Sequence, residues 1–598
     1  EDSTSTSSSS SSSRTPHLDQ AAMEGRRFLN WNSPAVLCSA SRAALLTGKY
    51  PVRTGIYPRV FEPDATHGLL PNETTLADYL RHAGYATKIV GKWHLGQRPD
   101  YLPTKRGFDS WFGIPYHMSG GSIDDHVCGK DTNHTEWLPL FDGTTIVEQP
   151  VQLTNLAPRY VEESISFMKT NVDQHKPFFL YLAFSHVHQL CAPRHSECQW
   201  SSTHFSRDHQ SYNATFDDAI QEMDWIAGKV LDSLKNELGS ENNTLVLFTS
   251  DNGPWTAEQS CAGTKGRFRG QWLADNVDIN CTACPSEYVP APLPGRPRRC
   301  IFPASSSSLD KDDTNNEVVV YEVEGIHCGQ DTGLGSAWEA NVRMPAFVKW
   351  PGGNIQAGSE TRDMVTTLDV VPTLLSLIRD APTIAVRNSS SSNSSSSNST
   401  ASTRSSSSTK NSYHTLTPLS ELDGIDVSDV FLGRSQQPQQ QQYDDNDDEA
   451  APHTEKEKAE DRVVFFWRDG FSTGPLPQPY GRFDVVAMKI GVMKLWFWTK
   501  SSHYNADKEV YHDPPLVFNV EDDPAEEYVL VDPNNKIDIS RLIIKARLLL
   551  QQHKESIDWT YPLCLERDTK YLPCVNETSK CRTTTTASTT TSTTTTTN

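Results

Sequence analysis

The sequence predicts an α/β fold: a large mixed, mostly parallel sheet sandwiched by helices, followed by a smaller C-terminal antiparallel sheet domain. Two apolar runs, at 178–184 and 245–249, have the length and composition of strands, and the first is of the kind buried on both faces. Between them, apolar residues at 217–238 recur every three or four positions, which indicates an amphipathic helix, and Gly239 suits its end. A strand, a helix and a strand in this order favour parallel pairing.

The smaller sheet is predicted from the C-terminal part of the chain. Three segments there are rich in apolar and aromatic residues: RVVFFWR at 462–468, FDVVAMKIGVMKLWFWT at 483–499 and PPLVFNVEDDP at 514–524. Short apolar runs of this kind, separated by turn residues, are typical of antiparallel strands.

The composition changes along the chain indicate two folded regions separated by low-complexity stretches. We expect a catalytic region at 14–385 with an insertion at about 257–330, a return segment at 413–434 and a C-terminal sheet domain at 462–565. The other stretches are polar: a low-complexity start at 1–13, a serine-rich insertion at 386–412, a Gln-rich and acidic linker at 435–461, and a Cys-containing, Thr-rich tail at 566–598. The serine-rich insertion and the acidic linker are expected to be disordered.

Net charge and the length of the apolar runs narrow the classes of function that the chain can have. The chain has 54 Lys and Arg against 75 Asp and Glu, a net charge of −21, which disfavours nucleic-acid binding. No apolar run approaches the roughly 18 residues of a membrane span. The chain begins at Glu1 without a visible secretory signal, so we interpret it as a fragment or a processed form.

Twelve cysteines and nine Asn-x-Ser/Thr sequons favour an oxidising, secretory route. The cysteines include local pairs such as Cys191/Cys198 and Cys281/Cys284; a zinc site at the second pair is disfavoured because no second pair follows at a suitable distance. The sequons begin at Asn72, Asn133, Asn213, Asn242, Asn280, Asn388, Asn393, Asn398 and Asn576.

Three strand-like runs end in side chains that can do chemistry. Lys92 and His94 follow a short strand-like run in ATKIVGKWHLG. Ser185, His186 and His188 follow the run at 178–184, and Asp251 and Asn252 follow the run at 245–249. In open α/β sheets ligands bind outside the carboxyl ends of strands, so we expect these groups to share one crevice.

Each of these groups also has an ordinary structural explanation. If the chain is extended at GKWHLG, Lys92 and His94 point to one face, where they could bind an anion. A strand end with a solvated lysine explains the same residues equally well. Asp251-Asn252 offers hard oxygen ligands to Ca²⁺ or Mg²⁺, although Asp251-Asn252-Gly253 is also a common turn. Taken alone, His188 is more readily a satisfied loop histidine than a site residue.

The stretch AVLCSASRAALLTGKYPVR, residues 35–53, places a cysteine where a helix is predicted to begin. Ser39 or Ser41 can cap that helix, and Gly48 suits its exit. Cys38 then lies at the positive end of the helix, with Arg42 one turn further on the same face. A guanidinium fork fits the oxygens of sulfate or phosphate; the alternative for Cys38 is a buried structural thiol.

Several separated motifs resemble the sulfatase family, of the arylsulfatase A/G type. Cys38-Ser39-Ala40-Ser41-Arg42 resembles the signature Cys-x-Pro/Ala-x-Arg, and GKWHLG resembles the second sulfatase signature. Further resemblances run in order from Arg14 to about Ile557: TPHLDQAAMEGRRF, TSDNGPW, SAWEANVRMP, LDVVPTLL and LVFNVEDDPAEEYVL.

This resemblance implies a function and a role for each residue. Cys38 would be converted by the formylglycine-generating enzyme to formylglycine, whose hydrate is the nucleophile, and Arg42 with one Ca²⁺ would stabilise it. Lys92 and His188, which fits the family spacing better than His186, would bind sulfate or assist the leaving alcohol, and His94 would act as base. The metal ligands would be Asp251, Asn252 and the modified Cys38. The substrate would be a sulfated sugar or an aryl sulfate, in a lysosomal or secreted enzyme.

The sequence departs from the family pattern at three places. The first family strand, with its aspartate pair, is absent before Thr15, and we expect a full-length precursor to contain it. Leu334 stands where relatives carry a sulfate-binding lysine, for which Lys265 is a candidate substitute, if it is not simply a surface lysine. His117 stands where relatives often have serine.

Two other functions remain open from the sequence. A phosphoester or phosphonate hydrolase of the same superfamily is disfavoured by the Cys38–Arg42 pentapeptide and by Lys92 and His94. An inactive relative that binds sulfated glycans is favoured by Leu334 and by the absent aspartates.

Overall fold

The computed structural model describes eleven ranges of the chain. They are 13–118, 138–188, 215–284, 289–291, 298–301, 322–379, 416–434, 462–468, 484–500, 509–531 and 538–573. The predicted pair Cys191/Cys198, six of the nine sequons, and most of the polar stretches lie outside these ranges.

Within these ranges helices and strands alternate along most of the chain. The helices are α1 Pro16–Met23, α2 Cys38–Thr47, α3 Pro51–Thr54, α4 Leu76–His82, α5 Leu156–Asp173, α6 Phe216–Asp232, α7 Gln271–Asn276, α8 Glu339–Val342, α9 Val370–Arg379, α10 Ser428–Leu432 and α11 Ile539–Ser556. The strands are β1 Arg26–Phe28, β2 Trp31–Asn32, β3 Ala86–Gly91, β4 Ser110–Gly113, β5 Leu140–Asp142, β6 Thr145–Glu148, β7 Phe178–Ala183, β8 Val246–Thr249, β9 Thr282–Ala283, β10 Val289–Pro290, β11 Arg299–Ile301, β12 Glu322–Glu324, β13 Ile326–His327, β14 Ala346–Lys349, β15 Ser359–Thr361, β16 Val365–Thr366, β17 Val463–Trp467, β18 Val485–Ile490, β19 Met493–Thr499 and β20 Val510–Asn519.

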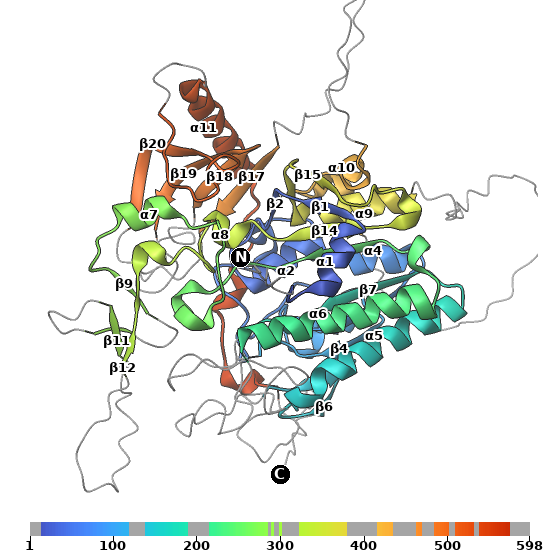
Figure 1. Ribbon diagram of the computed structural model, residues 1–598. Coiled ribbons are helices and arrows are strands. Elements are labelled where there is room, and N and C mark those ends of the chain that lie inside the picture. Colours follow the sequence, from blue (N-terminus) through green and yellow to red (C-terminus); the bar gives the residue numbers. More distant parts are fainter. Residues whose placement is uncertain are drawn as a thin grey trace, which may run out of the picture.

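The catalytic region is built on two mixed sheets, and the predicted fold class is confirmed. A five-stranded sheet has the order β6-β5-β4-β3-β7, in which β3 pairs in parallel with both β4 and β7. A four-stranded sheet has the order β15-β1-β14-β8. Helix α5 packs on β3, β4 and β7, while α4 packs on β3 from the side where α2 and α9 gather (Figure 1). The parallel strands bring three carboxyl ends to one edge.

The predicted strand–helix–strand unit is present as β7, α6 and β8. A capping box between Thr215 and Asp218 starts α6, a π-helical turn extends it, and Gly239 follows with a positive φ of 58°. The expectation that β7 is buried on both faces is wrong, because its side chains are mostly half-buried. In the described sheets β7 and β8 each stand at the end of a different sheet and do not pair with each other. The parallel pairing expected of this unit is therefore not found among the described residues, where β8 pairs antiparallel with β14.

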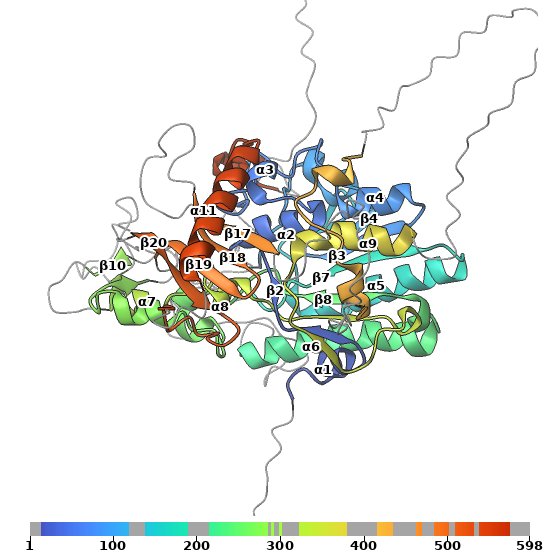
Figure 2. The ribbon, with the colours of Figure 1, turned by 90° about the horizontal axis from the view of Figure 1, so that it is seen from above.

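The C-terminal sheet is antiparallel, as predicted, with the order β17-β18-β19-β20. Helix α11, which the sequence analysis did not predict, packs on β18 and β20. Figure 2, seen from above, shows this sheet and α11 beside the catalytic region. Aromatic side chains from β17 and β19 join Tyr50 and Tyr57 in one buried cluster, so the two regions share a core.

Among the residues that the structure describes, two disulfides tie the insertion together: Cys281 bonds Cys328, and Cys284 bonds Cys300. A zinc site at Cys281/Cys284 is therefore excluded, because both sulfurs are already bonded. The sequon asparagines in the described ranges, Asn72, Asn242 and Asn280, are all exposed. Among the described residues no helix is both long and apolar enough to traverse a bilayer.

His553 on α11 is expected to make the folding stability depend on pH. Its ring stacks on Phe465 at 3.8 Å, and burial, followed by the charges of Arg53 and Lys554, lowers its pKa to about 3. The unfolded chain, in which histidine titrates near 6.5, therefore binds the extra proton first, and folding stability falls as pH drops from about 6.5 toward 3. Between pH 7 and 4.5 we expect a loss of about 2 kcal/mol from this residue.

Urea unfolding of the protein and of His553→Phe at both pH values measures that loss. The variant should lose less stability on acidification by about 2 kcal/mol, because phenylalanine binds no proton. His82→Gln, at an exposed position, is the control. An equal loss in His553→Phe and the parent protein would contradict the prediction.

Candidate active site

The predicted site residues lie close together at the carboxyl ends of β3, β7 and β8. Lys92 and His94 follow β3, His188 follows β7, and Asp251 and Asn252 follow β8. Cys38 and Arg42 lie beside them and come from helix α2. The charges of Lys92, Arg42 and Asp251 all act on Cys38, so these four groups lie close together.

Helix α2 begins at Cys38 itself. Its N-cap is Leu37, in an extended conformation without a side-chain cap, so the predicted serine cap is wrong. Ser39 instead accepts a hydrogen bond from the N–H of Phe61, and Ser41 contacts Ser33 at 3.0 Å. An uncapped helix start keeps backbone N–H groups available to an anion beside residue 38. The helix ends at Gly48 with φ 67°, as the sequence predicts.

Arg42 is held by two partners at the floor of the site. Its Nε donates to Asp251 Oδ2 at 3.1 Å, its Nη2 lies 3.0 Å from the same oxygen, and its Nη1 donates to the Lys92 carbonyl oxygen at 2.8 Å. The ammonium group of Lys92 is within hydrogen-bonding reach of Cys38. Residue 38 is therefore surrounded by two cations and one carboxylate.

Burial shapes the protonation of these groups. It raises the pKa of the Cys38 thiol, and Lys92 and Arg42 offset this only in part, so the thiol is not an activated thiolate. Burial lowers the pKa of Lys92. For Asp251 burial acts in the opposite sense, but Arg42 and Lys92 outweigh it and hold the carboxyl pKa below its ordinary value. The site thus keeps a carboxylate and a guanidinium beside a neutral thiol.

His94 is fixed with a definite tautomer. Its Nε2 lies 3.2 Å from the carbonyl oxygen of Phe61, which only accepts, so Nε2 carries the proton and Nδ1 the lone pair. Nδ1 is buried without a hydrogen-bond partner among the described residues. Burial, and then the charges of Lys92 and His117, lower the pKa of His94 well below its ordinary value. A neutral ring with a lone pair on Nδ1 can accept a proton.

The backbone at His94 differs from the extended chain expected there. Strand β3 ends at Gly91, and His94 has a positive φ of 59°. Trp93 nevertheless turns away from the site, with its Nε1 donating to the Tyr101 carbonyl oxygen. The turn is pinned by the N–H groups of Trp93 and His94, which donate to Ile114 and Pro115 on the segment after β4.

The two candidate histidines after β7 face different surroundings. His188 stacks on His117, with centroids 5.1 Å apart and planes 9° apart, and its charge acts on both His94 and Asp251. His186 is buried against α6, where its Nε2 lies 3.9 Å from Glu222 Oε1. The geometry therefore favours His188 over His186 as the site residue.

Asn252 and Asp251 fit a cation. The Oδ1 atom of Asn252 is buried without a hydrogen-bond partner among the described residues, which is costly unless something else satisfies it. Beside it the Asp251 carboxylate is kept ionised. Two oxygen donors are fewer than the six to eight that Ca²⁺ takes, and no cluster of three His, Cys, Asp or Glu suited to a metal occurs in the described ranges.

The departures seen in the sequence have clear structural settings. Leu334 is buried in an apolar cluster with Val36 and Leu37, next to the nucleophile segment. Lys265 donates from Nζ to Gln330 O at 2.7 Å, Thr332 Oγ1 at 2.8 Å and Arg269 O at 3.3 Å, and burial lowers its pKa to about 8. Lys265 thus anchors the loop that leads to Leu334, and its role toward sulfate stays a prediction.

Asn341 is a residue that the sequence analysis missed. Its Oδ1 accepts from the N–H of Gly253 at 3.0 Å, and its Nδ2 donates to the carbonyl oxygen of Val36 at 3.0 Å. One amide therefore ties the Asp251–Gly253 turn to the segment before Cys38. The only sequence signal was its place in SAWEANVRMP.

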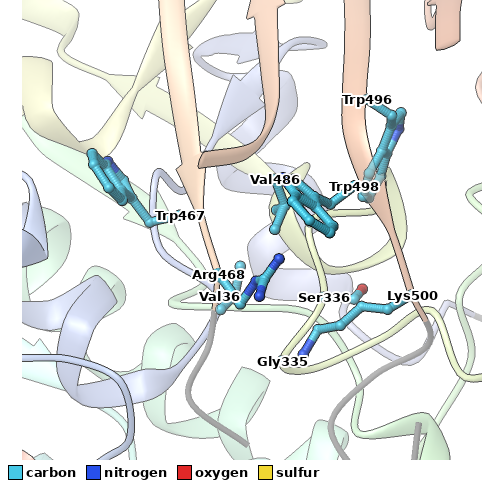
Figure 3. Close-up of a pocket in the computed structure, with 10 residues that line it drawn as sticks. Val36, Gly335, Ser336, Trp467, Arg468, Val486, Trp496, Trp498 and Lys500 are labelled. Carbon is cyan, nitrogen blue, oxygen red and sulfur yellow. The ribbon is translucent and has the colours of Figure 1, made fainter. Parts of the chain in front are cut away.

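A small pocket lies where the C-terminal sheet meets this segment (Figure 3). Its walls are aromatic, basic and small residues, namely Val36, Gly335, Ser336, Ala337, Trp467, Arg468, Val486, Trp496, Trp498 and Lys500. Arg468 lies over the Trp498 ring at 4.9 Å and pairs with Glu509 at 2.8 Å. Val36 places the pocket two residues along the chain from Cys38.

Comparison with known proteins decides the family. The sulfatase family profile matches residues 2–381, and a profile described as the C-terminal region of aryl-sulfatase matches 460–587. The chain belongs to the sulfatase family. As a sulfatase it is a hydrolase of sulfate esters.

Relatives of this sulfatase include arylsulfatases and an N-acetylgalactosamine-6-sulfatase. It is 28% identical to arylsulfatase G of Canis lupus familiaris over 534 residues, which cover 86% of this chain and 76% of that protein. It is 28% identical to arylsulfatase A of Homo sapiens over 539 residues, 87% and 79% of the two chains. An N-acetylgalactosamine-6-sulfatase of Rattus norvegicus is 33% identical over 374 residues, 61% and 57% of the two chains.

Solved structures show the same fold. The sulfatase PsFucS1 from Pseudoalteromonas sp. matches with a TM-score of 0.55 and 22% identity, over 91% of this chain and 86% of its own.

Proposed function

We propose that this sulfatase cleaves sulfate esters of carbohydrate or aryl alcohols with a formylglycine derived from Cys38 and one Ca²⁺ held by Asp251 and Asn252. The observation that carries the proposal is the setting of Cys38: an uncapped helix start, with Lys92 and Arg42 within charge range and Asp251 paired to Arg42. Two cations around one residue suit a dianionic transition state, and a neutral thiol is a poor nucleophile.

The chain's residues divide the work as follows. Lys92, Arg42 and the N–H groups at the start of α2 bind the sulfate oxygens and hold the sulfur next to residue 38. One hydroxyl of the aldehyde hydrate gives its proton to the neighbouring Asp251 carboxylate and attacks sulfur, the ester S–O bond breaks, and His188 gives a proton to the departing alcohol. His94 then accepts at Nδ1 the proton of the second hydroxyl, the C–O bond to sulfate breaks, and the aldehyde returns.

Asp251, Asn252 and residue 38 would hold the cation, which when bound lowers the pKa of a hydroxyl beside it and neutralises sulfate charge. Arg42 keeps Asp251 ionised and in place through two contacts to Oδ2. The orphaned Oδ1 of Asn252 supports this assignment.

The substrate class rests on the relatives named above, which are arylsulfatases A and G and an N-acetylgalactosamine-6-sulfatase. The pocket of Figure 3 adds nothing to this assignment, because Arg468 is buried and paired with Glu509 and Trp496 is fully buried. The two disulfides and the exposed sequon asparagines support a glycosylated enzyme of the secretory pathway, lysosomal or secreted, in which a formylglycine-generating enzyme modifies Cys38.

Two measurements test the proposal on the full-length protein made in secretory cells. Mass spectrometry of the peptide containing Cys38 should show loss of H₂S and gain of one oxygen, unlike any step of thiol oxidation. Turnover of p-nitrophenyl sulfate should exceed that of p-nitrophenyl phosphate and should need Ca²⁺. No turnover by formylglycine-bearing enzyme would instead favour a protein that only binds sulfated glycans.

Asp251→Ala should lower sulfatase activity at least about 100-fold at micromolar Ca²⁺, because it removes a metal ligand and the partner of Arg42. Raising Ca²⁺ to millimolar concentration should restore part of the rate by mass action. Initial rates against Ca²⁺ concentration check this, with Asp275→Ala, at an exposed aspartate, as control. A normal rate at low Ca²⁺ would contradict the metal assignment.

A further inference from the structure

We infer that His117 is a positioning residue for His188, holding that imidazole by ring stacking in the orientation from which it protonates the leaving alcohol. The inference rests on the proposed function and assigns to His117 a role beyond it. The stack itself is the observation: centroids 5.1 Å apart and planes only 9° apart.

The fold fixes His117 more firmly than its loop position suggests. It follows β4, the parallel neighbour of β3, and lies between Tyr116 and Met118, which are both fully buried. The carbonyl oxygens of Ile114 and Pro115 accept the N–H groups of Trp93 and His94. The half-buried His117 therefore lies on a segment that is anchored to the turn carrying Trp93 and His94.

His188 sits further from its own strand. Strand β7 ends at Ala183, five residues earlier, so sheet pairing does not fix the His188 ring. Hydrogen bonds to imidazole nitrogens lie in the ring plane. A partner stacked on the ring face thus restrains the orientation of His188 without competing for those nitrogens.

His117 also links His188 to His94. The His94 and His117 centroids are 5.5 Å apart with planes at 67°, so the three rings form one row from the proposed base to the proposed acid. Burial, and then the charges of His188 and Lys92, lower the pKa of His117 well below its ordinary value, so the middle ring is neutral. A neutral spacer adds no charge beside His188 and keeps the two proton-transfer groups apart.

A double-mutant cycle on formylglycine-bearing enzyme tests this role. His117→Ala, His188→Ala and the double variant are compared on aryl sulfates whose phenols range from strongly to weakly acidic. His117→Ala should lower kcat about 10- to 100-fold for the least acidic phenol and less than about 3-fold for the most acidic, because only the former needs a proton. In the His188→Ala background the same change should cost less than about 3-fold throughout.

His117→Phe is the matched control, since it keeps a stacking face and should recover most of the lost rate. If His117→Ala does not fold, as judged by its thermal unfolding midpoint, His117→Asn removes the ring with less loss of packing. Equal losses for all phenols, or equal losses with and without His188, would overturn the inference. Absence of turnover in the parent enzyme would instead refute the proposed function.

Discussion

Replacing Cys38 with alanine is expected to abolish sulfate ester hydrolysis while leaving the fold in place. The residue lies at the start of α2 with Lys92 and Arg42 beside it, and under the proposed function no other group supplies the attacking oxygen. Loss of a nucleophile lowers kcat by at least about 10⁴-fold in enzymes that use one. The methyl group of alanine fits where the thiol was, so the free energy of unfolding should fall by only about 1 kcal/mol.

The chain offers a matched control in Cys564, which is also a free, buried thiol with a raised pKa. Cys564→Ala should show a similar small loss of stability and no loss of activity. Steady-state rates with p-nitrophenyl sulfate and urea unfolding of both variants give the comparison. Activity above about 1% of the parent rate in Cys38→Ala would contradict the assignment of residue 38 as the nucleophile.

The features predictable from sequence were those set by local pattern. The apolar runs that became β7, β8 and the C-terminal strands, and the amphipathic period of α6, are encoded within a few residues. The convergence of Lys92, His94 and His188 also followed, because β3 and β7 are parallel neighbours whose ends meet at one edge, whereas Asp251 joins them from β8 in the other sheet. Helix α11 was missed although ISRLIIKARLLL carries the i, i+3 and i+4 spacing that would have revealed it.

The features that failed depend on contacts distant in sequence. Ser39 and Ser41 look like caps, but Phe61 and Ser33 engage their hydroxyls, which no local pattern shows. The positive φ of His94 follows from hydrogen bonds to the segment after β4. Likewise, the sequence around His117 does not indicate that it stacks on His188. The sequence around Asn341 does not indicate that it binds Gly253 and Val36, because all these partners are distant in sequence.

Contacts of this distant kind also join the two regions, through a buried charge network centred on Glu339. Its Oε2 accepts from Lys489 at 3.0 Å and its Oε1 from Lys494 at 3.0 Å, and both lysines come from the C-terminal sheet. All three side chains are fully buried. Burial alone would raise the pKa of Glu339, but the lysines and Arg343 hold it far below its usual range, while burial lowers that of Lys489 to about 8.

The network also reaches the active site. Glu339 lies in α8 two residues before Asn341, which holds both the Asp251–Gly253 turn and the segment before Cys38. The backbone N–H of Glu339 donates to Glu526 Oε2 at 2.7 Å, so a second buried carboxylate fixes the start of the same helix. Docking of the C-terminal sheet is therefore coupled to the placement of the nucleophile.

Glu339→Ala is accordingly expected to cost about 3–5 kcal/mol of stability, because it leaves the buried Lys489 and Lys494 without their shared carboxylate. Glu339→Gln should cost less, since its amide oxygen still accepts one lysine. The control is Glu360→Ala, which breaks the exposed pair with Arg27 and should change stability by less than about 1 kcal/mol. Urea unfolding measures all three, and rates below the unfolding transition should fall in Glu339→Ala but not in Glu360→Ala. A Glu339→Ala protein within about 1 kcal/mol of the parent, with an unchanged rate, would show that the sheet and the site are independent.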